Sequence, residues 1–543
     1  MLAVSNLSKS YGLKTVLQKI SFTLKPGEVA GLVGPNGCGK TTLLRILAGV
    51  ELPDSGSVHW TPAGLRMGYL PQGLEFSTAE TVDEYLSRTS GNLPTLLAQL
   101  ETAAEKISAN PDDSGARVVY DGLLGELARV SNNALPAEEV LRQFGLASQP
   151  GDTPVAHLSG GQKTRLALAA LLMTSPAVYL LDEPTNHLDI PMLEWLEDWL
   201  TRIRAAALVI SHDRVFLDRI CDIILELDPV THQIKEYSGN YSDYLQAREV
   251  ERQNAWQRYA EQQEEIADLR GAASHLRDIA RFHKGGKADG GDKFAKAFFA
   301  NRARATVGRA VHMEKRLQKL QNEDHIDKPR SGWSVKLDFD NTPGSGQRVL
   351  QLDAVSVGYE TLTLLENVNL YLKKGERAVI IGENGCGKTT LMRTIIGQLP
   401  PLAGAVTLGA GTVPGYLPQE QDTLPDGENP LEVVRHATGW NDTQARNYLH
   451  RYLFAGDDVF TPVASLSYGE RARLILAALA AQGCNLLLLD EPVNHMDIPS
   501  RERFEASLLE FTGTVLAITH DRYFIQQIAT SIWAVEDWTI HRA

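Results

Sequence analysis

Short apolar runs alternate with helix-like segments in both halves of the chain. Runs at residues 29–33 and 378–381 each lead into a glycine-rich turn, and helix-like runs follow at 43–48 and 391–396. Further short apolar runs stand at residues 177–181, 207–210, 486–489 and 515–518. Fully apolar runs of this length are typical of buried parallel strands that helices cover. The pattern therefore predicts an α/β protein with the same order of elements in each half.

The two glycine-rich turns carry the same phosphate-binding motif. They read GPNGCGKTT and GENGCGKTT, and Lys40 and Lys388 are 348 positions apart. Glycines let main-chain N–H groups point at phosphate oxygens, the lysine reaches the terminal phosphates, and a threonine hydroxyl binds Mg²⁺. We therefore expect two bound nucleotides with Mg²⁺. The predicted loop residues are Gly34, Pro35, Asn36, Gly37, Cys38, Gly39, Lys40, Thr41 and Thr42, and Gly382, Glu383, Asn384, Gly385, Cys386, Gly387, Lys388, Thr389 and Thr390.

Matching segments continue through both halves, but their spacing changes. It is 347 residues between the two YLPQ segments and 308 from Ser159 and Ser467 onward, so the first half carries 39 extra residues. The excess lies within residues 84–130, where two helix-like stretches flank the turn signal NPDDSG. We expect a small helical hairpin, called the arm here, although a longer loop is the alternative.

The segment between the halves, residues 241–330, looks helical. Residues 241–282 and 294–323 contain few helix breakers, and the glycine-rich HKGGKADGGD separates them. This pattern predicts a long antiparallel helical hairpin. At ~1.5 Å rise per residue, about 40 helical residues would span roughly 60 Å.

Positive charge is concentrated on this connector. Residues 266–320 hold 13 Lys and Arg against 5 Asp and Glu, which is a net charge of +8. Since the whole chain has a net charge of −14, the residues outside this segment have a net charge of −22. A solvated coiled-coil face is one explanation, and an arm that binds a polyanion, above all RNA, is the sharper one. The predicted RNA-binding residues are Arg281, Lys284, Lys287, Lys293, Lys296, Arg302 and Arg304.

Length and composition restrict the class of protein. With 543 residues the chain exceeds one hydrophobic core, and no apolar run approaches the roughly 20 residues of a membrane helix. The four cysteines have no metal-ligand spacing, and two lie inside the phosphate loops, which favours free thiols in a reducing compartment. We expect a cytoplasmic protein with no membrane association.

Polar side chains follow the apolar strands at the end that meets the phosphate loops. Asp182 and Asp490 are expected at Mg²⁺. Glu183 and Glu491 would lie near the γ-phosphate, where a carboxylate can accept a proton from water. The other predicted groups are amides for Mg²⁺ or water (Gln72 and Gln419), imidazoles for the γ-phosphate (His212 and His520), and rings that either stack on a base or only pack (Tyr11 and Tyr359).

LSGGQ and its counterpart LSYGE are a second type of anion site, because each opens a helix whose N–H groups are free. In a domain of this type the segment lies far from its own phosphate loop, so each ATP would need both halves, in a monomer that closes on ATP. The first set would complete the Lys388 site and the second the Lys40 site. These residues are Ser159, Gly160, Gly161 and Gln162, and Ser467, Tyr468, Gly469 and Glu470.

Together these motifs resemble ATP-binding-cassette proteins, and the tandem layout with PTNHLD and PVNHMD resembles the ABC-F family of translation ATPases. The resemblance implies cassettes at 1–240, with the arm, and 331–543, joined by the linker hairpin 241–330. It implies ATP hydrolysis with Glu183 and Glu491 as catalytic bases, and Lys40, Lys388, Thr41, Thr389, Asp182 and Asp490 holding ATP and Mg²⁺. It also implies a linker that enters the ribosomal tRNA exit site toward the peptidyl-transferase centre, contacting rRNA and tRNA in the exit or peptidyl site.

The chain departs from the family pattern at three positions, where Val493, Met496 and Tyr468 replace the usual threonine, leucine and glycine. Whether the two sites hydrolyse ATP equally is therefore open, as is the choice between a general translation factor and a protein that protects the ribosome from an antibiotic. A motor for a separate membrane transporter and an ATPase of DNA repair or maintenance are the competing functions. The basic connector does not suit the first, and the acidity of the remaining chain does not suit the second.

Overall fold

The protein is described from a computed structural model. It covers residues 1–62, 65, 67–73, 80–89, 93–109, 115, 117, 119–124, 137–147, 149–174, 176–186, 188–285, 293–328, 346–359, 362–419, 424–452, 454, 456–494 and 496–542. The side chains of residues 93–98, 109, 137–139, 280–285, 293–303 and 305 lie outside this description. Two compact units are present: Met1–Tyr241 together with Ser334–Ala543, and Ser242–Trp333. We call the two segments of the larger unit the first half and the second half, and the smaller unit the linker.

Each half contains a mainly parallel six-stranded sheet. In the first half its order is β5 (Met67–Leu70), β6 (Val178–Asp182), β7 (Ala206–Ile210), β3 (Val29–Val33), β8 (Ile223–Leu227) and β9 (Ile234–Ser238). In the second half it is β14 (Pro414–Leu417), β15 (Leu486–Asp490), β16 (Thr514–Ile518), β12 (Arg377–Ile381), β17 (Ser531–Glu536) and β18 (Thr539–Arg542). The central strands β6, β7, β15 and β16 are buried at every position, which explains their continuous apolar runs.

A three-stranded antiparallel sheet lies beside each large sheet. The first has the order β2 (Lys14–Leu24), β1 (Leu2–Tyr11) and β4 (Ser55–Trp60), and the second β11 (Leu362–Lys373), β10 (Arg348–Tyr359) and β13 (Ala403–Leu408). Alternating burial along β2 reflects a sheet with one face on the core, where Leu17 and Ile20 meet Leu43 and Leu208. This core lies directly behind the phosphate loop and fixes its base.

The helices of the first half are α1 (Lys40–Leu47), α2 (Val82–Thr89), α3 (Leu93–Ala109), α5 (Ala137–Gln143), α6 (Gly160–Met173), α7 (Ile190–Leu200) and α8 (Arg214–Ile220). Those of the second half are α11 (Lys388–Ile395), α12 (Pro430–Thr438), α13 (Asp442–Arg451), α14 (Tyr468–Ala481), α15 (Ile498–Glu510) and α16 (Arg522–Ile528). In the arm region, α3 coincides with the first predicted helical stretch, and residues 121–124, the start of the second stretch, are also helical. Residues 125–136 lie outside the description.

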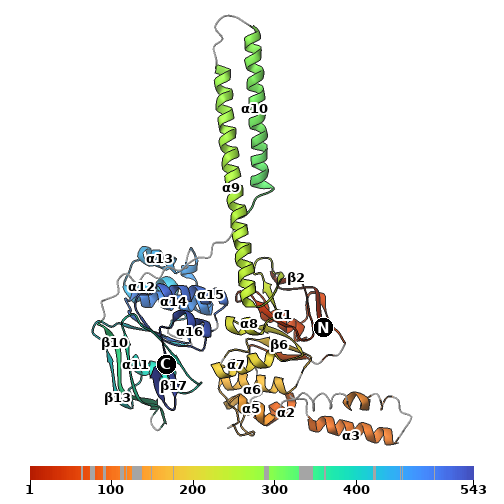
Figure 1. Cartoon of the computed structure of the whole chain (residues 1–543), viewed down its shortest axis with the longest axis vertical. Helices are drawn as coiled ribbons and strands as arrows, with labels where there is room; N and C mark the ends of the chain where they lie inside the picture. The colour runs from red at the N-terminus through yellow and green to blue at the C-terminus, as the bar shows by residue number, and fades with distance from the viewer. Residues whose placement is uncertain are drawn as a thin grey trace. The chain divides into compact units, whose positions relative to one another are not determined.

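The linker consists of two long helices, α9 (Tyr241–Gly285) and α10 (Lys293–Asn322), which run side by side in opposite directions (Figure 1). Two contacts set the register: Arg277 Nη2 of α9 lies 2.7 Å from Glu314 Oε1 of α10, and Gln262 Nε2 of α9 donates to Asp324 O, two residues after α10, at 2.6 Å. The predicted helical hairpin is confirmed, with ends close to the expected residues. Of the predicted RNA-binding residues, Arg304 is exposed and Lys287 lies outside the description, as do the side chains of Arg281, Lys284, Lys293, Lys296 and Arg302.

In the described part of the chain no helix is long and apolar enough to span a membrane. The four cysteines, Cys38, Cys221, Cys386 and Cys484, are free thiols.

Candidate functional site: two phosphate loops at the contact of the two halves

The two phosphate loops have nearly the same main-chain conformation. Gly37 and Gly39 have φ of 75° and 112°, and their counterparts Gly385 and Gly387 have φ of 84° and 102°. A Cβ atom at Gly39 would lie 2.5 Å from Val16 Cγ1, so this position also lacks room for a side chain. Neither α1 nor α11 has a side-chain N-cap, which leaves helix N–H groups available to phosphate oxygens.

Both lysines of the motif are buried and folded back over their own loops. Lys40 Nζ donates to Gly34 O at 2.7 Å and to Pro35 O at 3.0 Å. Lys388 Nζ donates to Gly382 O and to Glu383 O, each at 2.7 Å. These carbonyls hold the ammonium groups beside the loop, where a triphosphate would take their place as acceptor.

The carboxylates at the ends of β6 and β15 fit a magnesium site. Asp182 and Asp490 are buried, and in the described structure the oxygens Asp182 Oδ2 and Asp490 Oδ1 have no hydrogen-bond partner. A hydrogen bond from Thr41 lowers the pKa of Asp182 and one from Thr389 lowers that of Asp490, but burial outweighs both and raises the two pKa values. A buried acceptor without a donor suits a cation, and Mg²⁺ commonly uses one carboxylate with a hydroxyl and phosphate oxygens. Bound Mg²⁺ would supply charge neutralisation on the phosphates.

The next residue in each half, Glu183 or Glu491, has a left-handed main chain with φ of 53° or 47°. Glutamate rarely adopts this conformation, and such strain concentrates at functional sites. A hydrogen bond from the Glu183 main chain to Ile210 O at 2.9 Å holds the turn, and Glu491 repeats it with Ile518 O. The turn aims each carboxylate toward the histidine that follows the neighbouring strand.

The two glutamate–histidine pairs have similar geometry. Glu183 Oε1 lies 3.2 Å from His212 Nε2, and Glu491 Oε1 lies 3.6 Å from His520 Nε2. Burial raises the pKa of Glu183 and that of Glu491 to about 8. Burial also lowers the pKa of His520 to about 4, and the nearby Lys388 lowers it further. A carboxyl group with a pKa near neutrality can both take and release a proton at working pH, as a general base requires.

Both signature segments use their side chains to cap a helix. Ser159 and Gln162 form a reciprocal capping box at the start of α6, and Ser467 and Glu470 form the same box at the start of α14. The side chains are therefore occupied by the cap, and main-chain N–H groups remain as the anion-binding feature. The Tyr468 hydroxyl donates to the main-chain oxygen of Gln419 within its own half.

Residues of both halves line one cavity of about 250 Å³, which we call the interface cavity. Ser159 and Gly161 contribute from the first half, and Asn384, Gln419 and Glu491 from the second. An adjoining cavity of about 210 Å³ is lined by Lys388, Thr389 and Asp490 among others. The structure thus brings the first signature segment to the Lys388 phosphate loop, in the head-to-tail arrangement expected from the sequence.

At the Lys40 loop, the main-chain N–H of Asn36 donates to Asp497 Oδ2 of the second half at 2.8 Å. Gln72 is exposed, and so are Tyr11 and Tyr359. The hydroxyl of Tyr11 donates to Glu51 Oε1 at 2.5 Å, which leaves its ring face as the part available to a base.

Two ion pairs that the motifs did not predict join the halves. Arg214 donates to Glu505 with Nη1 at 3.1 Å and Nη2 at 3.4 Å, and Arg522 makes the symmetric pair with Glu197. The arginines directly follow the two HD motifs and the acids lie on α7 and α15, so each pair recurs at the same spacing of 308 residues. That repeated spacing of opposite charges was a usable signal in the sequence.

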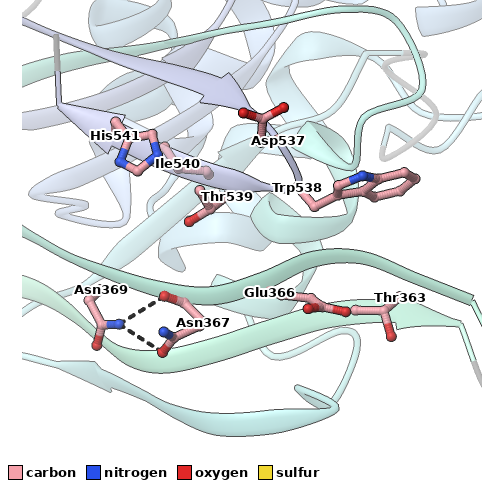
Figure 2. A pocket seen from close by; sticks show the side chains of 9 residues that line it. All are labelled: Thr363, Glu366, Asn367, Asn369, Asp537, Trp538, Thr539, Ile540 and His541. Atoms are coloured by element: carbon pink, nitrogen blue, oxygen red, sulfur yellow. Dashed lines mark hydrogen bonds between the residues drawn. The ribbon is translucent and has the colours of Figure 1, made fainter.

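A larger hollow of about 790 Å³ lies at the surface of the second half, between β11 and β18 (Figure 2). Asn369 Nδ2 donates to Asn367 O at 2.8 Å there, and Trp538 is 62% exposed. Its nine lining residues include none of the predicted nucleotide-binding residues. We assign the chemistry to the interface cavity, because that cavity holds a phosphate loop, a buried glutamate and a helix N-terminus together.

A family model described as ABC transporter matches residues 17–186 and 365–494, and a second model with that description matches residues 230–338. ABC transporter F family member 5 of Arabidopsis thaliana is 36% identical over 98% of this chain and 75% of its own length. Putative ATP-binding protein YdiF of Bacillus subtilis is 36% identical, covering 98% and 79%. Tylosin resistance ATP-binding protein TlrC of Streptomyces fradiae is 35% identical, covering 96% and 94%.

Among solved structures, RNase-L Inhibitor superimposes with a TM-score of 0.61 at 20% identity, over 98% of this chain and 88% of that one. This likeness concerns the fold alone.

Proposed function

The chain belongs to the ABC-F family of twin-cassette ATPases, and from this premise we propose that it acts on the ribosome, inserting its linker at the tRNA exit site when ATP closes the two halves. Hydrolysis of ATP is the activity of the matched domains. We propose that hydrolysis opens the closed form and so releases the protein from the ribosome. We also propose that the protein acts in the cytoplasm and as a monomer.

The charge on the linker is the observation that carries the proposal. Residues 266–320 have a net charge of +8 in a chain whose total is −14. In the described part of α10, Arg304, Arg309 and Lys315 are exposed. Exposed cations on a long helical hairpin suit contact with RNA phosphates. A helix pair that only faces water would be expected to carry charges of both signs in similar numbers.

The name of one relative supports a role at a drug target. TlrC of Streptomyces fradiae is named for tylosin resistance and matches nearly the full length of this chain. We propose that action on the ribosome serves one of two physiological roles, protection of the ribosome from a drug or general translation. Growth of a deletion strain with and without ribosome-targeting drugs would separate them, since a translation factor would be needed without the drug as well.

The first experiment uses the variant Glu183→Gln/Glu491→Gln, which should bind ATP without hydrolysing it. We expect this variant to cosediment with ribosomes far more than the wild type in ATP. Lys40→Ala/Lys388→Ala, which should not bind ATP, is the matched control and should stay in the supernatant. Cosedimentation equal to that of the control would refute the proposal, and retention on duplex DNA in its place would favour the competing DNA-directed function.

A second experiment tests the linker itself in the same trapped background. Arg304→Glu/Arg309→Glu should weaken ribosome association and reduce the slope of affinity against salt by about 2, one for each lost phosphate contact. Lys14→Glu/Lys25→Glu changes the net charge equally at exposed positions of the first half and should have little effect. Equal effects of the two double variants would show that total charge, rather than the linker, drives association.

A further inference from the structure

The two halves differ at one buried position where they meet. At the 308-residue spacing, Arg501 at the start of α15 corresponds to Leu193 at the start of α7. Arg501 is 6% exposed and Leu193 is 2% exposed, and both line the interface cavity. A guanidinium group offers five N–H donors in a rigid fork, whereas a leucine side chain can neither donate nor accept. The position therefore breaks the symmetry of the two ATP sites.

Arg501 joins two loops of the second half. Its Nε donates to Met496 O at 3.0 Å, and its Nη1 donates to Asp521 Oδ2 at 2.6 Å. Asp521 directly follows His520, the histidine of the Lys388 site, and Met496 directly precedes Asp497. The arginine thereby fixes the loop that carries His520 relative to the loop that carries Asp497.

Asp497 continues this connection into the first half. Its Oδ2 accepts the hydrogen bond from the main-chain N–H of Asn36, at 2.8 Å, within the phosphate loop of Lys40. At the other end, neither ring nitrogen of His520 has a hydrogen-bond partner in the described structure, so the imidazole is available to a phosphate. A series of polar contacts thus runs from the histidine of one ATP site to the phosphate loop of the other.

The equivalent series in the opposite direction is interrupted. It would run from His212 and Asp213 through position 193 to Asp189, but Leu193 cannot bond to either loop. Arg522 Nη2 lies 3.7 Å from Asp213 Oδ2, longer than the 2.6 Å contact that Arg501 makes with Asp521. The acid that follows each histidine is therefore anchored differently in the two halves.

We propose that Arg501 is a positioning residue that couples nucleotide binding at the Lys388 site to the phosphate loop of the Lys40 site. When a γ-phosphate draws His520 toward it, Asp521 moves with it, and the rigid guanidinium fork transfers the displacement to Asp497 and Asn36. The coupling works in both directions for binding, as linkage requires, but it uses this one route, because Leu193 does not supply a second one. Loss of Arg501 should therefore weaken ATP binding at both sites by the same factor.

The test measures steady-state hydrolysis with one site at a time made inactive. In Glu491→Gln, hydrolysis reports the Lys40 site while the Lys388 site still binds ATP, and Glu183→Gln gives the reverse. In the Glu491→Gln background, Arg501→Leu should raise KM by about 10-fold, within the usual 5- to 150-fold range of coupling between sites. Arg501→Lys retains a donor and a charge at this position and should recover much of the lost affinity.

A gain of coupling provides the matched control. Leu193→Arg places the missing donor opposite Asp213, so it should lower KM in the Glu183→Gln background and, because binding linkage is reciprocal, by a similar factor in the Glu491→Gln background. Asp521→Ala, which removes the acceptor and leaves the arginine in place, should reproduce Arg501→Leu, and thermal unfolding should show that all variants fold. Equal losses of kcat at both sites, or no recovery by Arg501→Lys, would overturn the proposal and leave Arg501 as interface packing.

Discussion

Replacing Arg214 by methionine would test how strongly the two halves are held together. Its guanidinium donates to both oxygens of Glu505 at 3.1 and 3.4 Å, and both side chains are buried. Removing one member of a buried ion pair costs about 3–5 kcal/mol, because the remaining charge stays buried without compensation. Every 1.4 kcal/mol is a tenfold change in an equilibrium constant, so the equilibrium between associated and separated halves should shift by about 100-fold or more.

Protonation of Glu505 limits this cost and makes it depend on pH. Burial raises the pKa of Glu505 to about 7, and the charge of Arg214 holds it below where burial alone would place it. In Arg214→Met the pKa of the associated form rises further above the ordinary value for glutamate. A raised pKa of this kind leaves the association intact at low pH and weakens it as the pH rises through the raised value. The defect should therefore be small near pH 6 and large near pH 8.

The assay is energy transfer between dyes placed on the two halves, followed against ATP concentration at both pH values. The guanidinium carbon of Arg214 lies 4.2 Å from the centroid of the Tyr523 ring. Methionine preserves much of this packing, so the variant removes mainly the charge. Arg214→Met/Glu505→Met removes both charges and should recover most of the closure. If the double variant closed no better than the single one, or if the single defect were independent of pH, an uncompensated Glu505 charge could not be the cause.

Two further predictions concern the phosphate loop and the metal. Gly39→Ala should destabilise the nucleotide-free protein by about 1–3 kcal/mol more than Gly37→Ala in thermal unfolding, since both have positive φ but only the first would place Cβ 2.5 Å from Val16 Cγ1; the opposite order would contradict this reasoning. Asp182→Asn in the Glu491→Gln background should raise the Mg²⁺ concentration needed for half-maximal hydrolysis at least about 10-fold, because an amide replaces the buried anionic oxygen; an unchanged Mg²⁺ requirement would place the metal elsewhere.

The sequence predicted local structure well, because the decisive signals were local. Short apolar runs before Lys40 and Lys388 indicated buried strands, and the strands are buried at almost every position. The linker helices also followed from local composition, since α9 and α10 contain few helix breakers within their bounds.

Contacts between distant segments were harder to foresee. Arg214 and Glu505 are 291 positions apart, and only the recurrence of both charges at the 308-residue spacing, as Arg522 and Glu197, marks them as partners. The role of Ser159 and Gln162 as a capping box was also missed, although the S-x-x-Q spacing was visible in the motif. The sequence shows that Leu193 and Arg501 differ, but only the fold shows that both line one cavity between the halves.

Joining the two halves in one chain has a genetic consequence. In an enzyme built from two identical subunits, every substitution appears twice, because the two-fold axis copies it to both active centres. Here a codon change at position 501 or 468 occurs once, without a matching change at the corresponding position 193 or 160 of the first half. Selection can therefore change the ATP affinity or the hydrolysis rate of the two centres separately, without a second gene.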